Sequence, residues 1–232
     1  MSDEQVVWAG SPSQWRHVRA NMIEQWAESG DWELAIPAAD EFLAECERIG
    51  VFYNAITVAF VRAMLRLGLG DLDGAVADQA FALGHARVAK DPQVLYYALA
   101  VAVHVHADTG QVEAAREHFD ELLSLDPAAF RYIGLAVGDV TWAAPTIDRA
   151  KSAQHALAFA DWPSFQAARA LLDGDPVGAA AIYDAHGAAR SAALARLRGG
   201  EPAELHRALE FFTRVGATRY ARECERLLNA VL

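Results

Sequence analysis

Apolar and small residues recur along most of the chain at intervals of three and four positions. In the segment before Gly110, for example, Leu99, Val103 and His106 fall on one side of a helix. No segment shows a sustained alternation of apolar and polar residues with a period of two, so no strand is expected. The pattern therefore predicts an all-α protein. The expected helices lie near residues 11–28, 31–49, 51–67, 71–89, 92–108, 111–124, 128–144, 146–160, 163–172, 175–186, 188–198, 202–214 and 218–231.

A turn recurs between these helices at regular intervals. A glycine is followed five residues later by alanine at Gly30–Ala35, Gly70–Ala75 and Gly110–Ala115, with 40 residues between successive glycines. Weaker copies follow at Asp148–Ala153 and Gly174–Ala179, and a last turn lies at residues 199–200. Glycine ends a helix in the left-handed conformation, and a small alanine lets two helices approach closely. The repeat therefore predicts a stack of helical hairpins.

Two further residues predict local helix geometry. Ser11, with Pro12 and Gln14 after it, forms a capping-box sequence that should start the first helix. Pro37 lies inside the second expected helix and should either kink that helix or delay its start. The acidic pairs Asp71/Asp73 and Asp173/Asp175 flank turns, where N-capping is their ordinary role.

The third hairpin resembles a tetratricopeptide repeat. The resemblance rests on Gly110, Val112, Ala115, Phe119, Leu122 and Pro127, which match the turn and second helix of that repeat. It implies an all-α, right-handed solenoid of about six helical hairpins plus a C-terminal capping helix. We expect one domain over residues 1–232, with an extension at 1–10, three long repeats at 11–126, three shorter repeats at 127–214 and the capping helix at 215–232.

The C-terminal part resembles a narrower group of proteins. Residues 163–229, and most specifically residues 215–220 (VGATRY), are similar to the helical-repeat tail of large bacterial signalling ATPases of the adenylate/guanylate-cyclase-associated and transcription-activator types. The resemblance implies a regulatory or interaction module. The phosphate-binding loop of an ATPase is missing, because Lys90 and Lys151 lie in helical segments without a glycine-rich loop. We therefore expect no cofactor, no enzymatic activity, and no shift of the melting temperature with ATP, GTP or divalent metals.

Composition and charge narrow the environment and the partners. Alanine occupies 49 of 232 positions, which favours closely packed helices, and the formal net charge is −11. Residues 1–126 carry 20 acids and 8 bases, whereas residues 127–232 carry 11 acids and 12 bases. An acidic chain disfavours nucleic-acid binding. The two cysteines have no metal-type spacing, and we find no export signal or membrane span, so we expect a cytoplasmic protein.

The histidines and arginines have more ordinary interpretations than catalysis. His104 and His106 lie two positions apart on a helix and cannot bind one metal ion together. We expect His106 in the core and His104 on the concave face of the stack, and we expect no metal site. The arginines between residues 196 and 226 could bind a phosphate, but their spacing from Glu204, Glu210 and Glu225 favours a solvated helix surface.

A concave groove is the expected binding surface of such a stack. Alignment of the hairpins on their turn glycines places Glu24, Glu28, Tyr97, His104 and Asp108 on it. We expect a protein or peptide partner, with a basic segment preferred by the acidic N-terminal half. The alternative function is small-molecule sensing in an accessory domain, and a pocket with convergent polar groups in place of an open groove would favour it.

The beginning of the chain is a second candidate surface. Trp8 and Trp15 lie where a first hairpin has no neighbour to cover it, and exposed aromatic clusters are typical of interfaces. We expect docking of a partner or self-association at this N-terminal edge. The alternative is that residues 1–10 fold back and cap the hairpin themselves.

Overall fold

The described part of the protein consists of α-helices. The computed structural model describes residues 11–50, 52–125, 136–156 and 161–230, and for residues 154–156 it describes the backbone alone. Within these ranges there are thirteen α-helices and no strand, as the hydrophobic pattern predicts. The helices are α1 (Pro12–Ser29), α2 (Trp32–Ile49), α3 (Tyr53–Leu69), α4 (Leu72–Ala89), α5 (Pro92–Asp108), α6 (Val112–Ser124), α7 (Val137–Ala143), α8 (Ala150–Ala156), α9 (Pro163–Leu172), α10 (Pro176–Ala185), α11 (Ala189–Gly199), α12 (Pro202–Arg214) and α13 (Thr218–Ala230).

The expected turn chemistry is confirmed at the helix ends. The turn glycines adopt positive φ angles, 94° at Gly30 and 91° at Gly70, and Asp148 takes the same left-handed conformation with φ 57°. The alanines that follow these turns are buried, namely Ala35, Ala75, Ala115, Ala153 and Ala179. The repeat in the sequence therefore marks buried positions that follow the turns.

The predicted caps are also present. Ser11 starts α1 through a capping box, in which the backbone N–H of Gln14 donates to the Ser11 Oγ and the Ser11 N–H donates to Gln14 Oε1. In each acidic pair one residue is the N-cap: Asp71 and Asp175 accept a hydrogen bond from the backbone N–H three residues later. Asp73 lies in the first turn of α4, and Asp173 is the C-cap of α9, so the N-cap expectation is wrong for these two. Pro37 lies inside α2, which begins at Trp32, so the expected delay of that helix is wrong.

The structure departs from the expected boundaries in the middle of the chain. The helix expected at 128–144 is described only from residue 136, since residues 126–135 lie outside the described ranges, and α7 covers Val137–Ala143. The helix expected at 146–160 begins later, at Ala150, because residues 144–148 form turns that include Pro145. The described elements of the fourth hairpin are therefore shorter than those of the first three.

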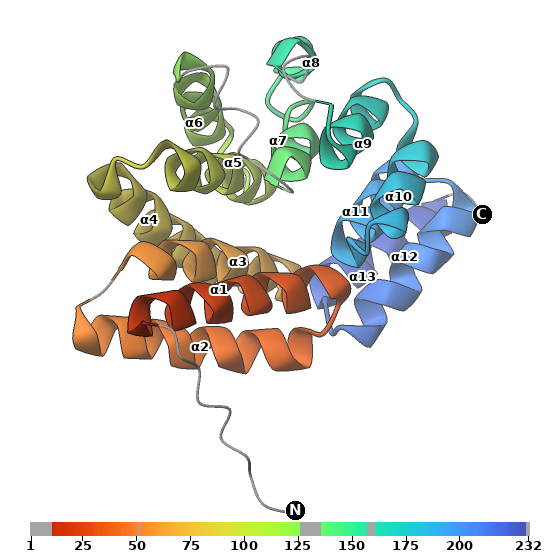
Figure 1. The fold of residues 1–232 in the computed structure, drawn as a ribbon. Coiled ribbons are helices and arrows are strands. Elements are labelled where there is room, and N and C mark those ends of the chain that lie inside the picture. The colour runs from red at the N-terminus through yellow and green to blue at the C-terminus, as the bar shows by residue number, and fades with distance from the viewer. Residues whose placement is uncertain (1–10, 51, 126–135, 157–160, 231–232) are drawn as a thin grey trace, which may run out of the picture.

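The helices follow one another around an arc, and the last helices of the arc contact the first ones. Most helices pack against the next one along the chain, and α1, α3, α5, α7 and α9 also pack side by side. At the far end, α11 contacts α1 and α13 contacts α3, so the C-terminal helices lie against the N-terminal ones (Figure 1). The stack is therefore closed by its own end.

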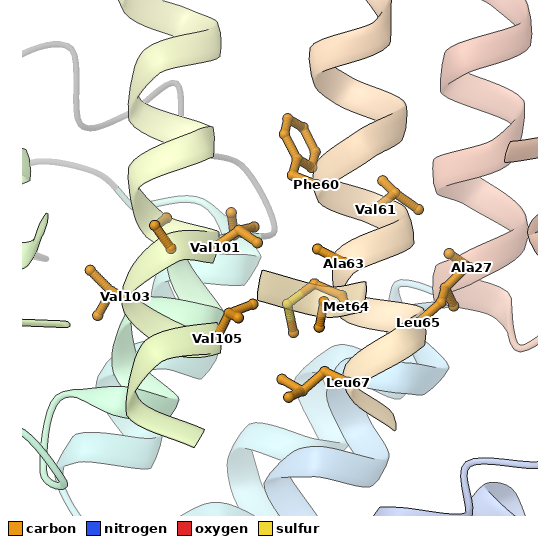
Figure 2. Close-up of a cluster of buried hydrophobic side chains, with 14 of the residues drawn as sticks. Ala27, Phe60, Val61, Ala63, Met64, Leu65, Leu67, Val101, Val103 and Val105 are labelled. Carbon is orange, nitrogen blue, oxygen red and sulfur yellow. The ribbon is translucent and has the colours of Figure 1, made fainter. Parts of the chain in front are cut away.

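The hydrophobic core continues through this closure. Side chains of α3 and α5, among them Met64 and Val101, face one another across the middle of the core (Figure 2). The same buried cluster includes Trp32 near the N-terminus and Phe212, Tyr220 and Cys224 near the C-terminus. The two ends of the chain thus share one core.

Gly68 allows the close contact between α3 and α13. A Cβ atom at this position would lie 2.7 Å from the Trp32 ring and 3.3 Å from the Tyr220 ring. The closure therefore depends on a helical glycine that packs between the side chains of two distant aromatic residues.

Candidate functional site

The sequence-predicted groove residues lie together on the inner helices of the arc. Glu24 and Glu28 come from α1, and Tyr97, His104 and Asp108 come from α5. The Tyr97 hydroxyl donates a hydrogen bond of 2.5 Å to Glu24 across 73 positions of sequence. The alignment of the hairpins on their turn glycines therefore predicted correctly that these faces of α1 and α5 lie side by side.

Residues of α11 cover the α1 part of this face. The Arg190 guanidinium donates to the Glu28 carboxylate at 2.9 Å, and the Ser191 hydroxyl donates to the same carboxylate at 2.9 Å. Arg190 also lies 3.5 Å from Asp139 in α7. Burial opposes charge on Arg190, but the neighbouring carboxylates outweigh it and raise the pKa of the guanidinium. Arg190 is therefore a fixed positive charge between two acids.

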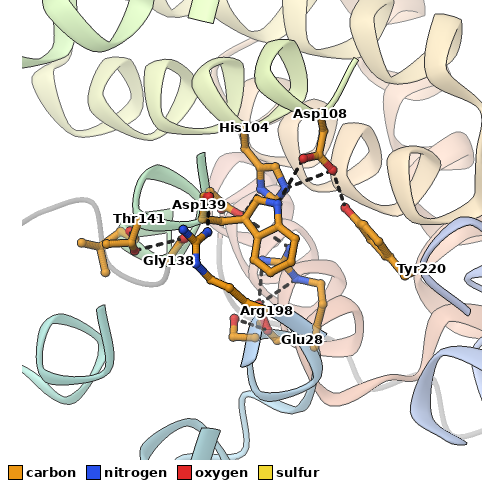
Figure 3. A network of polar contacts seen from close by, with 12 residues as sticks. Glu28, His104, Asp108, Gly138, Asp139, Thr141, Arg198 and Tyr220 are labelled. Carbon is orange, nitrogen blue, oxygen red and sulfur yellow. Dashed lines mark hydrogen bonds and ion pairs between the residues drawn. The ribbon is translucent and has the colours of Figure 1, made fainter. Parts of the chain in front are cut away.

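His104 lies between two carboxylates in the interior. Its Nδ1 is 2.9 Å from Asp139 Oδ1, its Nε2 is 3.7 Å from Asp108 Oδ2, and its side chain is fully buried (Figure 3). Burial opposes protonation, but the hydrogen bond with Asp139 and the negative charges of Asp108 and Asp139 raise the pKa of the imidazole above its ordinary value. The geometry favours an imidazolium ion that holds α5 against α7.

Asp108 connects this centre to α13. Its carboxylate accepts hydrogen bonds from Arg219 at 2.6 Å and from the Trp142 indole at 3.1 Å, and the Tyr220 hydroxyl lies 3.5 Å away. Burial raises the pKa of this carboxyl, but His104 and Arg219 more than reverse that effect and hold it well below its usual range. Asp108 is therefore ionised and bound on three sides.

These buried and half-buried polar groups form what we call the closure network: Glu28, His104, Asp108, Asp139, Arg190, Ser191 and Arg219. Its three carboxylates face two guanidinium groups and the imidazole of His104, so each acid has a basic neighbour. The expectation of an open groove at Glu28 and His104 is wrong, because only 5% and 0% of these residues is exposed. Within the chain, Arg190 of the C-terminal part supplies a positive charge to Glu28 on this acidic face.

Two cavities adjoin the network. A small one of about 30 Å³ lies beside Glu24, Tyr97, Asp139 and Arg190, which is room for about two water molecules. A larger pocket of about 360 Å³ opens between α5, α7, α11 and α13. We call it the Arg198 pocket, and its lining residues are Asp108, Trp142, Leu197, Arg198, Arg219, Tyr220, Glu223 and Leu227.

The Arg198 pocket corrects the interpretation of the arginine-rich end as a solvated surface. Arg198 and Arg219 turn inward to line the pocket, and Arg196 is buried in ion pairs with Asp184 and Glu204. The expected surface pair between Glu204 and Arg207 is present. The sequence pattern alone could not separate these arginines, since each lies in an amphipathic helix with acids nearby.

Comparison with known proteins finds neither a matching family model nor a matching curated protein. The resemblances to tetratricopeptide repeats and to the tails of signalling ATPases therefore stay predictions. Among the described residues, no group of three or more acidic, histidine or cysteine side chains is placed to bind a metal ion. No helix in the described ranges has both the length and the apolar character needed to span a membrane.

The other predicted residues lie apart from the network. His106 is 8% exposed and packs on the His118 ring, as expected of a core histidine. Trp15 lies on α1 with 40% of its surface exposed, whereas Trp8 lies outside the described residues. The predicted N-terminal edge is therefore described only in part.

Sequence reasoning missed several residues of the site. Arg190, Ser191, Asp139 and Trp142 carry no recognisable motif, and each acquires its role from contacts across 34 to 163 positions. One signal did exist in the charge asymmetry between the acidic first half and the more basic second half. That asymmetry matches the ion pairs that join the two ends.

Proposed function

We propose that this chain is a non-enzymatic, small-molecule-binding regulatory domain whose ligand occupies the Arg198 pocket. The observation that carries the proposal is a 360 Å³ pocket with convergent polar groups at the place where the two ends of the arc meet. This volume lies at the lower end of the range that is typical of small-molecule sites. Peptide binding in a concave groove is less well supported, because α11 contacts Glu28 and α13 contacts Asp108 on the face where that groove was expected.

Packing energetics argue against a peptide that displaces the C-terminal helices. Phe212 and Cys224 are fully buried and Tyr220 is 5% exposed, all within the core that also contains Trp32. Exposure of one such aromatic side chain costs about 1.5–3 kcal/mol, and removal of the helices would expose several together. Breaking the Arg190–Glu28 and Arg219–Asp108 pairs would add the cost of unpaired buried charges.

The state of His104 supports a binding role over an enzymatic one. A general acid or base needs one ring nitrogen within reach of a substrate. Here both ring nitrogens face carboxylates and the ring is fully buried. His104 therefore serves as a structural contact between the acids of the closure network.

The position of the pocket suggests how a ligand would act. Its walls come from α5 and α7 in the middle of the chain and from α11 and α13 at the end. A ligand that contacts both walls stabilises the closed arc, because it binds the folded arrangement and not the unfolded chain. This coupling fits an accessory domain of a signalling ATPase or cyclase, with the right-handed tetratricopeptide-type stack as its scaffold.

The test is a fragment screen read by the indole resonances of the isotope-labelled chain. The Trp142 resonance is assigned with the variant Trp142→Phe, and Trp162, which is 54% exposed, serves as the reference. We expect saturable shifts of the Trp142 resonance and a rise of the melting temperature with the same fragments. At a ligand concentration 100 times the Kd, the free energy of unfolding should increase by about 2.7 kcal/mol. Fragments that shift only surface indoles, or none at all, would contradict the proposal.

A specific observation favours protein binding as a second candidate function. Trp15 and Met22 are 40% and 41% exposed, and their spacing of seven residues places them on one face of α1. Exposed aromatic and methionine side chains on one helix face are typical of contact surfaces. A protein partner, or a second copy of the chain, would bind at this N-terminal edge and not in the arc.

A further inference from the structure

Arg198 differs from the other cations around the Arg198 pocket. Arg219 is neutralised by Asp108 at 2.6 Å. Arg198 donates from Nη1 to the backbone carbonyl of Trp142, and its guanidinium lies over the Trp142 ring at 5.6 Å. Among the described residues, no carboxylate lies within ion-pair distance of Arg198. Its charge is therefore uncompensated by an acid in the part of the chain that the structure describes.

Arg198 keeps donors available on the pocket side. Its Nε and Nη2 have no hydrogen-bond partner among the described residues, and neither is sealed from solvent. Burial lowers the pKa of this guanidinium, and no ion pair with an acid among the described residues reverses the effect. An anion in the pocket would supply the missing countercharge and accept hydrogen bonds from Nε and Nη2. Such charge-assisted hydrogen bonds are stronger than those between neutral groups.

The other charges of the pocket limit the anion to a small negative charge. Asp108 and Glu223 are acids on the same walls, so a dianionic phosphate would meet two carboxylates for a single available guanidinium. Glu223 is paired with Arg226, outside the pocket, at 2.6 Å. A monoanion is therefore the best match to the local charge.

The remaining walls favour an apolar or aromatic body on that anion. Leu197 and Leu227 contribute apolar surface, and Trp142 and Tyr220 contribute rings. Aromatic rings and leucines stabilise a flat organic group through buried apolar area. A bare inorganic anion would leave these surfaces in contact with water.

We propose that the Arg198 pocket binds a small monoanionic organic acid, with its carboxylate on the Arg198 guanidinium and its apolar body between Trp142 and Leu227. The inference rests on the proposed function and names the class of its ligand. The ligand would thus join three helices, with its carboxylate on Arg198 of α11 and its apolar body against Trp142 of α7 and Leu227 of α13.

The test uses benzoate, its neutral counterpart benzamide and inorganic phosphate as probes on the full chain, with the Trp142 indole resonance as the readout. We expect saturable binding of benzoate and binding of benzamide that is weaker by about tenfold, because the amide lacks the charge. Phosphate should bind more weakly than benzoate. This comparison needs no variant, so it holds even if a substitution at Arg198 impairs folding.

Variants then assign the charge to its residue. Arg198→Gln should weaken benzoate binding by about tenfold or more, whereas Arg222→Gln, which removes an exposed charge from α13 outside the pocket, should not. Glu223→Gln should tighten benzoate binding by about twofold, because it removes a like charge from the wall. Arg198→Lys, which keeps the charge but loses the planar fork, should lie between wild type and Arg198→Gln.

The outcomes separate this inference from the proposed function. Equal binding of benzoate and benzamide, unchanged affinity in Arg198→Gln, or tighter binding of phosphate than of benzoate would overturn the anion class while a pocket ligand remains. The first two results would also mean that Arg198 only ties α11 to the Trp142 carbonyl. If no neutral, cationic or anionic fragment shifts the Trp142 resonance, both the inference and the proposed function fail.

Discussion

The Arg190 guanidinium in α11 lies 2.9 Å from the Glu28 carboxylate in α1, although 162 positions separate the two residues in the sequence. Both side chains are nearly buried, and Ser191 donates a further hydrogen bond to the same carboxylate. This pair joins the second half of the chain to its first helix. It turns what would be a binding groove into an interior.

Removal of Arg190 should destabilise the fold strongly. Arg190→Gln leaves Glu28 and Asp139 without their shared cation, and breaking a buried pair on one side costs about 3–5 kcal/mol. The measurement is the free energy of unfolding from denaturant titration. The control is Arg226→Gln, which breaks an exposed pair with Glu223 and should cost about 0–1 kcal/mol. Similar losses in the two variants would show that the closure network does not stabilise the fold.

Stability should fall as the pH rises above neutrality because of His104. Its pKa is raised in the folded state from 6.5, so its contribution is complete below that value and disappears as the pH rises through the folded pKa. The groups that face it are Asp108 and Asp139, with Arg190 beyond Asp139. Urea unfolding of the wild type and of His104→Gln between about pH 6 and pH 9 measures the effect. A stability difference between the two that stays constant or grows with pH would contradict it.

Glu24→Gln should stabilise the protein at alkaline pH. Burial is the main cause that raises the pKa of Glu24, despite the hydrogen bond from Tyr97, so the ionised form is disfavoured in the folded state. The amide oxygen can still accept from Tyr97, and the gain should be on the order of 1 kcal/mol at pH 8 and vanish in acid. Thermal unfolding at both pH values tests this. Glu28→Gln is the matched control and should destabilise, because that carboxylate is paired with Arg190.

Gly68→Ala should separate α3 from α13. The added Cβ would lie 2.7 Å from the Trp32 ring, which is closer than packed atoms allow, and such overpacking costs about 1–3 kcal/mol. Gly84→Ala is the control, because that exposed position in α4 has no neighbouring atom within 4 Å and alanine favours helices by up to about 1 kcal/mol. Denaturant unfolding should therefore shift in opposite directions. A shift in the same direction would mean that α13 adapts to the methyl group.

The N-terminal edge should behave as a docking surface. We expect the wild type to self-associate or to require a partner, and Trp8→Ser combined with Trp15→Ser to remove the association. Sedimentation velocity over a range of concentrations measures it. A wild type that stays monomeric at high concentration, together with a double variant of lower stability, would establish instead that residues 1–10 cap the first hairpin.

The helices and their turns were predictable because their causes are local. Gly30 and Gly70 end helices by backbone conformation, Ser11 caps by a hydrogen bond to a residue three positions away, and Ala35 marks a crossing within one hairpin. The repeat of 40 residues likewise records contacts between neighbours. The same local alignment placed Tyr97 and Glu24 on one inner face, where they form a hydrogen bond.

The closure of the arc was decided only by the tertiary structure, because small rotations between successive hairpins accumulate over the whole stack. No local pattern shows that α11 reaches α1, that Gly68 lies against Tyr220, or that His104 is enclosed by acids from two helices. The sequence by itself determined the helices, their hairpins and the charge imbalance between the halves. The tertiary structure decided that acids of the first half pair with Arg190 and Arg219 of the second, and that Arg198 lines a pocket without an ion pair of its own among the described residues.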